Sequence, residues 1–401
     1  MISEGGAMPV ANAVAAMAEE LAEWRRDFHR HPELMYAETR TAARVAELLR
    51  SFGLDAVETG VGGTGVVGVL HGSRGPGAGE ADTILLRADM DALPIVEATG
   101  AAHASCNPGV MHACGHDGHT TMLLGAAKRL AETRAFDGTV VFCFQPAEEG
   151  GAGAQAMLDD GLLERFPARA VYGMHNWPGM PVGSFAVRAG PTMAMADEFF
   201  IDIAGRGGHA AKPELARDPI VAGAALVQAL QTIVSRQVDA NEAAVLSITR
   251  FNGGSATNVI PERVELAGTV RAFSEATHRA ISEAIDRMCA QIGAASDVSI
   301  AYRQGESVYP PVRNDPDEAA FCGRVLDALA GRDRVTHDHP PVMGSEDFAF
   351  LAKARPGAFV FIGSGDIAPL HHPEYDFDDA VSPWGVSYWV ELVQAALPRP
   401  A

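Results

Sequence analysis

The stretch MHACGHDGHT brings a thiol and an imidazole together, because Cys114 and His116 stand two residues apart before a predicted helix. A thiolate and an imidazole are both good ligands for zinc and similar borderline metals. Taken alone, the pair is equally compatible with a buried thiol among structural histidines. It is therefore a candidate metal site that depends on support from other parts of the chain.

The motif QPAEEG adds two adjacent carboxylates, Glu148 and Glu149, directly after an apolar stretch. A buried carboxylate needs a partner, and a metal ion would provide one. Because neighbouring side chains diverge, one acid can bind a metal while the other faces a reacting water molecule. The alternative is a solvated loop with two surface acids, which the motif by itself favours slightly.

Three further histidines follow apolar stretches, namely His175 in YGMHNWP and the pair His371 and His372 in PLHHPEYDF. The strands of one α/β sheet would bring all these motifs to a common edge. The combined set offers more sulfur, nitrogen and oxygen ligands than one tetrahedral metal needs. It therefore suggests two ions that share a bridging ligand.

Two aspartates in RADMDALP, Asp89 and Asp91, stand at the end of another predicted strand. One of them could accept a hydrogen bond from a ligating imidazole, or they could cap the following turn, and both interpretations have equal weight. The motif GTGVVG precedes a strand instead of a helix, so it is interpreted as a glycine-rich turn. His29 and His31 are interpreted as capping or surface groups, and three further histidines stay unassigned: His103, His112 and His119.

The elements that must position these residues alternate along the first part of the chain. Helices are predicted at about 11–34, 39–52 and 119–133. Strands are predicted at 65–72 and in TILLRADMDALP, TVVFCFQPAEEG and AVYGMHNWP. Strands that alternate with helices, with polar motifs at their carboxyl ends, indicate an α/β sheet with its site along that edge.

The pattern changes near residue 195, where the predicted order becomes β-α-β-β-α-β. This order is typical of a ferredoxin-like domain. After it, DEAAFCGRVLDALA and GAFVFIGSG return to a helix and a strand. We therefore expect an inserted domain at 195–305 and a discontinuous catalytic domain at 1–194 and 306–401.

Composition excludes several classes of partner. The 401 residues include 51 acidic and 31 basic side chains, a formal charge of −20. Such acidity argues against nucleic acid, because phosphate binding needs clustered Lys and Arg. Five cysteines in so long a chain do not suggest a disulfide framework and favour the cytoplasm. No apolar run approaches the roughly 20 residues that span a bilayer, so we expect no membrane partner.

Motifs spread through nearly the whole chain resemble the dinuclear metallopeptidase family, which includes aminoacylases, metallo-carboxypeptidases and succinyl-diaminopimelate desuccinylase. The closer resemblance is to its amidohydrolase branch of hippurate hydrolases, bacterial N-acyl-amino acid amidohydrolases and auxin-conjugate hydrolases. The matching motifs are RRDFHRHPEL, LRADMDALP, MHACGHDGH, QPAEEG, GMHNWP, GRGGHAAKP, ATNVIPE, GTVRAF, GSEDFAF and LHHPEYDF. Each motif is weak alone, but the combination is specific.

The resemblance implies a role for each matching residue of the catalytic domain. Cys114 would bridge two divalent metal ions. These ions would be zinc or manganese, and cobalt or nickel would also be compatible. The remaining ligands would be His116, Glu149, His175 and His371. Glu148 would be the catalytic base, and Asp91 would be the orienting aspartate.

The resemblance also implies a mixed-sheet, zinc-peptidase-like catalytic domain with an inserted lid and dimerisation domain. In the lid, His209 matches a histidine that reaches the active site of the other subunit in related proteins. Asn258 and Arg271 match polar residues that contact substrate. The protein would then be a homodimer or a higher homo-oligomer, assembled through the lid.

The predicted reaction is metal-dependent hydrolysis of an N-acyl-L-amino acid to a carboxylate and an amino acid. Two alternatives keep the fold: a dipeptidase or carboxypeptidase, and a metal-binding protein without turnover. A third alternative is a thiol nucleophile at Cys114 paired with His116. The adjacent Glu148 and Glu149 argue against a storage site, which has no need for an acid beside its ligand.

Overall fold

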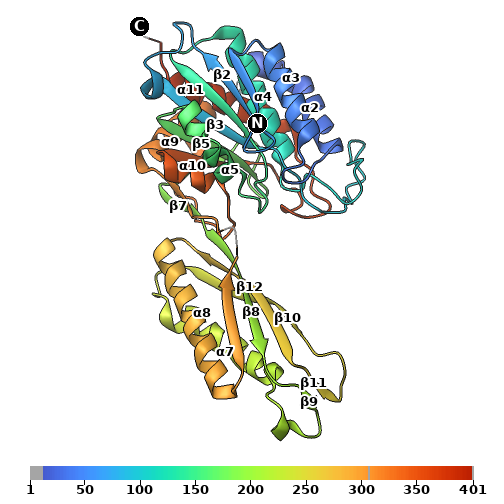
Figure 1. Ribbon diagram of the computed structural model, residues 1–401. Helices are drawn as coiled ribbons and strands as arrows, with labels where there is room; N and C mark the ends of the chain where they lie inside the picture. The colour runs from blue at the N-terminus through green and yellow to red at the C-terminus, as the bar shows by residue number, and fades with distance from the viewer. Residues whose placement is uncertain (1–11, 306–307, 400–401) are drawn as a thin grey trace, which may run out of the picture. The chain divides into compact units, whose positions relative to one another are not determined.

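Separate sheets organise the two units of the chain in the computed structural model, which describes residues 12–305 and 308–399 (Figure 1). Unit 1 comprises Met1–Thr192, Arg313–Pro340 and Asp347–Ala401. Unit 2 comprises Met193–Val312 and Pro341–Glu346. The expected insertion at 195–305 lies inside unit 2.

The large sheet has eight strands in the order β1-β2-β4-β3-β5-β16-β6-β15. Neighbouring strands are parallel in the pairs β3–β4, β3–β5, β5–β16 and β6–β15, and antiparallel in β1–β2, β2–β4 and β6–β16. The predicted mixed α/β sheet is thereby confirmed. The strands are β1 Ala56–Val61, β2 Gly65–His71, β3 Thr83–Asp89, β4 Thr139–Gln145, β5 Ala170–Trp177, β6 Phe185–Ala186, β15 Val335–Thr336 and β16 Gly357–Gly363.

The inner strands are buried along their full length. Every residue of β3, β4 and β16 is buried, as expected for near-continuous apolar runs that are covered on both faces. Helix α4 packs against both α2 and α11, and Figure 1 shows α2, α3 and α4 together along one side of unit 1. The helices of this unit are α1 Asn12–Ala15, α2 Ala18–Arg30, α3 Thr39–Ser51, α4 His116–Thr133, α5 Gly153–Asp159, α6 Leu162–Arg165, α9 Pro316–Ala330, α10 Phe348–Ala354 and α11 Ser382–Ala396.

Helix boundaries follow local chemistry. Helix α9 begins at Pro316, and the Asp315 carboxylate before it accepts hydrogen bonds from the N–H groups of Asp317 and Glu318. The helix predicted at 11–34 is instead two helices, α1 and α2, and Ala11 lies outside the described residues. Helix α2 ends at Arg30 because the residue that precedes Pro32 is driven away from helical backbone angles.

The parallel strands share one edge at their carboxyl ends. Asp89 at the end of β3 is paired in register with Gln145 at the end of β4. On the neighbouring strands, His175 of β5 is paired with Phe361 of β16. The motifs that carry the predicted chemistry therefore follow strands whose ends meet at one edge of the sheet.

Unit 2 contains a four-stranded antiparallel sheet in the order β10-β12-β8-β13. Apart from the short strands β9 and β11, its elements follow as strand, helix, strand, strand, helix, strand. Helices α7 and α8 pack against each other and share one apolar core with the sheet (Figure 1). The elements are β8 Met195–Ala204, β9 Gly208–His209, α7 Pro219–Gln237, β10 Ala244–Gly253, β11 Val259–Ile260, β12 Arg263–Ala272, α8 Glu275–Ser296 and β13 Ser299–Gln304.

Two short strands, β7 Gly190–Met193 and β14 Val312–Asn314, form a separate two-stranded sheet. A search of the helices within residues 12–305 and 308–399 finds none that is long and apolar enough to cross a bilayer. All five cysteines are free thiols.

Helix α2 contributes a buried charged network, which corrects the interpretation of His29 as a capping or surface group. His29 is fully buried, with Nδ1 2.8 Å from Asp117 Oδ2 and Nε2 3.4 Å from Glu97 Oε1. Arg25, also buried, lies 3.7 Å from Asp117. Burial and Arg25 lower the pKa of His29, but the two carboxylates outweigh them and raise it to about 9.

Substitution of His29 should therefore change how stability depends on pH. The folded-state pKa of about 9 lies above the ordinary value of 6.5, so the protonated imidazole stabilises the fold by about 3 kcal/mol below pH 6.5. This contribution is lost as the pH rises through about 9. We expect urea midpoints to fall across this window more steeply in the wild type than in His29→Gln. Parallel curves for the two proteins would contradict the assignment.

Candidate metal centre

A glycine turn places Cys114 and His116 at the start of α4. Gly115 has φ of 92°, in the left-handed region that favours glycine. A Cβ at this position would lie 2.3 Å from Asn176 Oδ1, so no other residue fits without displacement of that side chain. Both Cys114 and His116 are buried, and they stand on either side of this turn.

The structure brings the predicted ligands together. Cys114 Sγ lies 3.4 Å from His175 Nε2, and Glu149 Oε1 lies 3.9 Å from His116 Nε2 and 3.3 Å from His371 Nε2. Cys114, His116 and His175 form one group whose ligand atoms all lie within 4.8 Å of one another. Cys114, Glu149 and His371 form a second such group. Cys114 belongs to both groups, which is the arrangement expected of a ligand shared by two ions.

Unsatisfied atoms within this cluster fit a cation. His116 Nε2 and Glu149 Oε1 are buried without a hydrogen-bond partner in the part of the chain that the structure describes. Buried polar atoms almost always have a partner, so an ion that accepts both lone pairs would satisfy them. Thiolate, imidazole and carboxylate donors together suit divalent transition metals.

His371 reaches the centre from a strained backbone. Its φ is 65°, a left-handed conformation that is unfavourable for a residue with a side chain. The backbone N–H of His371 donates a hydrogen bond to the Ala113 carbonyl at 2.7 Å, which ties this loop to the one before α4. Its side chain is 53% exposed, so His371 lies at the open side of the cluster, whereas His372 is not part of either ligand group.

The surroundings of the cluster favour positive charge. Burial, Glu149 and Glu148 raise the pKa of the Cys114 thiol well above its usual value. Burial lowers the pKa of His116, but Asp89 and Asp91 outweigh it and raise this pKa to about 10. Cys114 would have to be deprotonated to bind a metal, and a bound cation would promote that change.

Asp91 holds the two adjacent glutamates in place. Its Oδ1 accepts a hydrogen bond from the backbone N–H of Glu148, and its Oδ2 accepts one from that of Glu149, both at 3.0 Å. The backbone carbonyl of Asp91 lies 2.8 Å from His116 Nδ1, closer than its carboxylate at 3.3 Å. Asp91 thus contacts a candidate ligand through its backbone and the loop of the candidate base through its side chain.

Sequence reasoning left His119 unassigned and did not consider Arg87 or Asn176. His119 Nδ1 lies 2.7 Å from Asp89 Oδ1, and His119 Nε2 lies 2.7 Å from Asn176 Oδ1. Arg87 is buried and forms ion pairs with Asp89 and Asp347, at 2.7 and 2.8 Å. The signal for this network was available, because a lone arginine in the apolar strand TILLRAD needs buried acceptors.

Three predicted residues, His209, Asn258 and Arg271, belong to unit 2. His209 and Asn258 line a cavity of about 530 Å³ beside β9 and β11. Arg271 lies on β12 and is paired in register with Ala196, near the start of β8. His209 lies on β9, which follows the opposite end of β8, at Ala204. Ala196 and Ala204 are roughly 26 Å apart along β8, at about 3.3 Å per residue.

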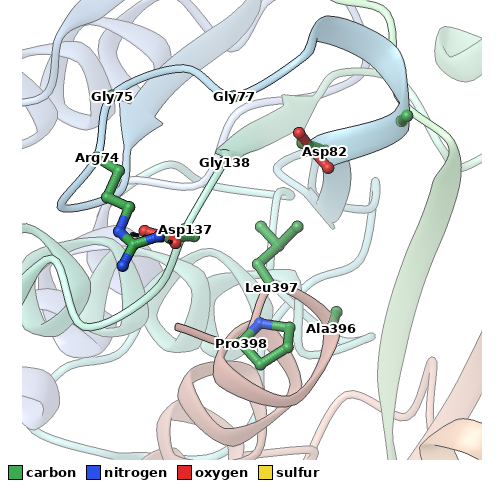
Figure 2. A pocket seen from close by; sticks show the side chains of 10 residues that line it. Arg74, Gly75, Gly77, Asp82, Asp137, Gly138, Ala396, Leu397 and Pro398 are labelled. Carbon is green, nitrogen blue, oxygen red and sulfur yellow. Dashed lines mark ion pairs between the residues drawn. The ribbon is translucent and has the colours of Figure 1, made fainter. Parts of the chain in front are cut away.

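A second cavity, in unit 1, lies at the edge of the large sheet opposite the carboxyl ends of β3 and β4 (Figure 2). It has a volume of about 340 Å³ and lies where β3 and β4 begin, next to Asp82 and Gly138. Its charged residues Arg74 and Asp137 are paired with each other at 3.6 Å, as the dashed line in Figure 2 marks. It contains none of the predicted site residues.

The fold and the cluster define a protein with a buried divalent-metal site at the carboxyl edge of a mixed α/β sheet. Residues 85–395 match the model of peptidase family M20/M25/M40, and the chain belongs to this family.

Two relatives and one solved structure illustrate the similarity. The hippurate hydrolase of Campylobacter jejuni is 42% identical over 375 residues, which cover 93% of this chain and 95% of that protein. The N-acetylcysteine deacetylase of Bacillus subtilis is 37% identical, with coverage of 95% and 98%. The Bacillus subtilis YxeP protein, described as a dinuclear metal-binding peptidase of the M20 family, superposes with a TM-score of 0.81. It is 34% identical, and the match covers 96% of this chain and 99% of that one.

Proposed function

We propose that the protein is a metal-dependent amidohydrolase that cleaves the amide bond of N-acyl-L-amino acids to give a carboxylate and a free amino acid. The observation that carries the proposal is the convergence of two ligand groups on Cys114, with Glu148 and Glu149 beside them. Hippurate and N-acetylcysteine, which the relatives' names specify, are both N-acyl amino acids. Their shared chemistry supports the substrate class and leaves the acyl group open.

The metal-binding residues in this proposal are Cys114, His116, Glu149, His175 and His371. Cys114 would be shared by two divalent ions, with zinc or manganese as the expected metals and cobalt or nickel as compatible ones. When bound, such ions lower the pKa of a coordinated water and polarise the amide carbonyl. His175 Nδ1 lies 2.7 Å from the carbonyl of Asn176, which orients the ring so that Nε2 points to Cys114.

Glu148 would act as general base and then as general acid. Its carboxylate lies within 4.8 Å of ligand atoms of His116 and Glu149 and is only 7% exposed. It would remove a proton from the attacking water and later donate it to the departing nitrogen. The hydrogen bond from the Glu148 N–H to Asp91 fixes the backbone from which this side chain extends.

Residues of unit 2 would bind substrate. Arg271 is half-buried and donates to Thr269 and the Val270 carbonyl. Glu198 and Asp197 attract its charge, but neither forms an ion pair with it in the part of the chain that the structure describes. The two-pronged guanidinium of Arg271 suits the carboxylate of the N-acyl amino acid substrate. His209 would stabilise the developing oxyanion, with Asn258 next to it.

The separation of His209 from Arg271 along β8 supports assembly of the site from two subunits. If both residues contact one small substrate, they cannot come from the same copy of unit 2. We propose a homodimer or higher homo-oligomer in which unit 2 provides the interface. The five free cysteines agree with a cytoplasmic location, which is part of the same proposal.

A substrate panel on the metal-reconstituted protein tests this function. The panel contains N-acetyl and N-benzoyl amino acids, dipeptides and peptides with a free carboxyl terminus, and bound metal is quantified in parallel. We expect turnover of N-acyl amino acids that exceeds turnover of the dipeptides. A preference for dipeptides or longer peptides would favour a peptidase, and metal binding without any turnover would favour a non-catalytic protein.

A further inference from the structure

The loop that carries Glu148 and Glu149 has a strained backbone. Ala147 and Ala152, on either side of the pair, have φ angles of 54° and 53°. A residue with a side chain in this left-handed region costs free energy and persists only where surrounding contacts fix it. The contacts that hold Ala147 therefore also determine how Glu148 enters the metal centre.

One of these contacts comes from Glu38, far away in the sequence. Its carboxylate is buried, and Oε1 accepts a hydrogen bond from the Ala147 N–H at 2.8 Å. The Ala147 carbonyl accepts one from the Gly153 N–H at 3.0 Å, so both backbone polar groups of the strained residue are fixed. The hydroxyl of Thr64 donates to the other carboxylate oxygen of Glu38 and orients it.

The side chain of Glu38 does not cap the helix at whose start it stands. It occupies the N-cap position of α3 but makes no capping hydrogen bond with its side chain. The capping acceptor is Glu33 instead, whose carboxylate accepts from the N–H groups of Arg40 and Thr41 at 3.0 and 2.8 Å. The burial of the Glu38 carboxylate, which is costly and raises its pKa, is compensated by the Thr64 hydroxyl, by the N–H of Glu38 itself and by the Ala147 N–H of the loop.

Neighbouring carboxylates extend the same support along the loop. Asp91 accepts the N–H groups of Glu148 and Glu149, and Asp347 accepts the N–H of Ala154 at 2.9 Å. Glu38 contacts Ala147, the residue directly before Glu148.

We propose that Glu38 is a positioning residue for amide hydrolysis, which holds Ala147 in its left-handed conformation and so directs Glu148 toward the metal centre. This inference rests on the proposed function of Glu148. A displacement of about 1 Å in a reacting group can cost roughly 10²-fold in rate, so loss of this contact should act on kcat more than on substrate binding.

The test compares Glu38→Ala and Glu38→Gln with the matched control Glu33→Ala, which removes the partly buried contacts to Arg40 and Thr41 and leaves the contact between Glu38 and Ala147 in place. We expect Glu38→Ala to lower kcat by about 10²-fold, with KM and bound metal close to those of the wild type. Glu38→Gln keeps an acceptor for the Ala147 N–H and should recover most of kcat. Glu33→Ala should lower Tm without lowering kcat.

Hydrogen exchange of the metal-reconstituted proteins gives a readout that needs no substrate. Amides of residues 145–154 should exchange faster in Glu38→Ala than in Glu33→Ala. Unchanged exchange, or equal losses of kcat in the two variants, would overturn the proposal. If the wild type hydrolyses no N-acyl amino acid, the proposed function fails, while the exchange result still decides the role of Glu38. If Glu38→Ala does not fold, Thr64→Val replaces it, with kcat expected to fall roughly 2–10-fold and exchange to rise.

Discussion

Glu148→Gln should hydrolyse N-acyl amino acids about 10²–10⁴-fold more slowly than the wild type and still bind its metals. Glutamine has nearly the same size and shape as glutamate, so the loop and its hydrogen bonds to Asp91 should persist. An amide has no useful basicity, however, and cannot remove a proton from the attacking water. The expected result is therefore a loss in kcat with little change in metal content.

The control for this variant is Glu47→Gln, which makes the same chemical change at an exposed position of α3. Among residues 12–305 and 308–399, Glu47 pairs only with Arg44, and its side chain is 68% exposed. We expect this variant to have wild-type kcat and KM. Turnover by Glu148→Gln within a factor of about two of the control would remove Glu148 from the role of general base.

Cys114→Ala should lose both metal and activity, because the thiol belongs to both ligand groups. Loss of a residue that only supports a ligand typically weakens metal binding by about 10–100-fold, and loss of a shared ligand should exceed that. We expect substoichiometric metal after dialysis and activity below about 1% of the wild type. The measurement is metal content and kcat on the same sample.

Chelation separates this role from that of a thiol nucleophile. The wild type stripped of metal should be inactive and should recover when zinc or manganese is added back. Full activity after chelation would show that Cys114 acts without a metal. Cys143→Ala is the matched control, because Cys143 is also buried but contacts Met157 in the core.

Much of the fold could be predicted because its elements have strong local signals. The apolar runs TVVFCFQ and GAFVFIG could only be buried strands, and both lie in the middle of the large sheet. Parallel strands end at one edge, so polar motifs that directly follow them had to gather there. This reasoning brings Glu149 and His175 together although their positions in the sequence are far apart, whereas Cys114 follows no strand directly and stands just before α4.

The contacts that support the ligands were much harder to predict. Glu38 stands at a helix start, where an acidic residue has an ordinary explanation, and nothing local distinguishes it from Glu33. His29 follows two arginines in the charged stretch RRDFHRHPEL, which resembles a surface segment, yet it is buried against Asp117 and Glu97. Such contacts depend on which segments meet in three dimensions, and the local pattern does not contain that information.

Anomalous diffraction from crystals of the metal-reconstituted protein tests the central claim most directly. We expect two peaks of metal density, both about 2.3 Å from Cys114 Sγ, with the nitrogen and oxygen ligands of His116, Glu149, His175 and His371 around them at about 2.0–2.2 Å. Full metal occupancy at any other place, with Cys114 Sγ uncoordinated, would contradict it.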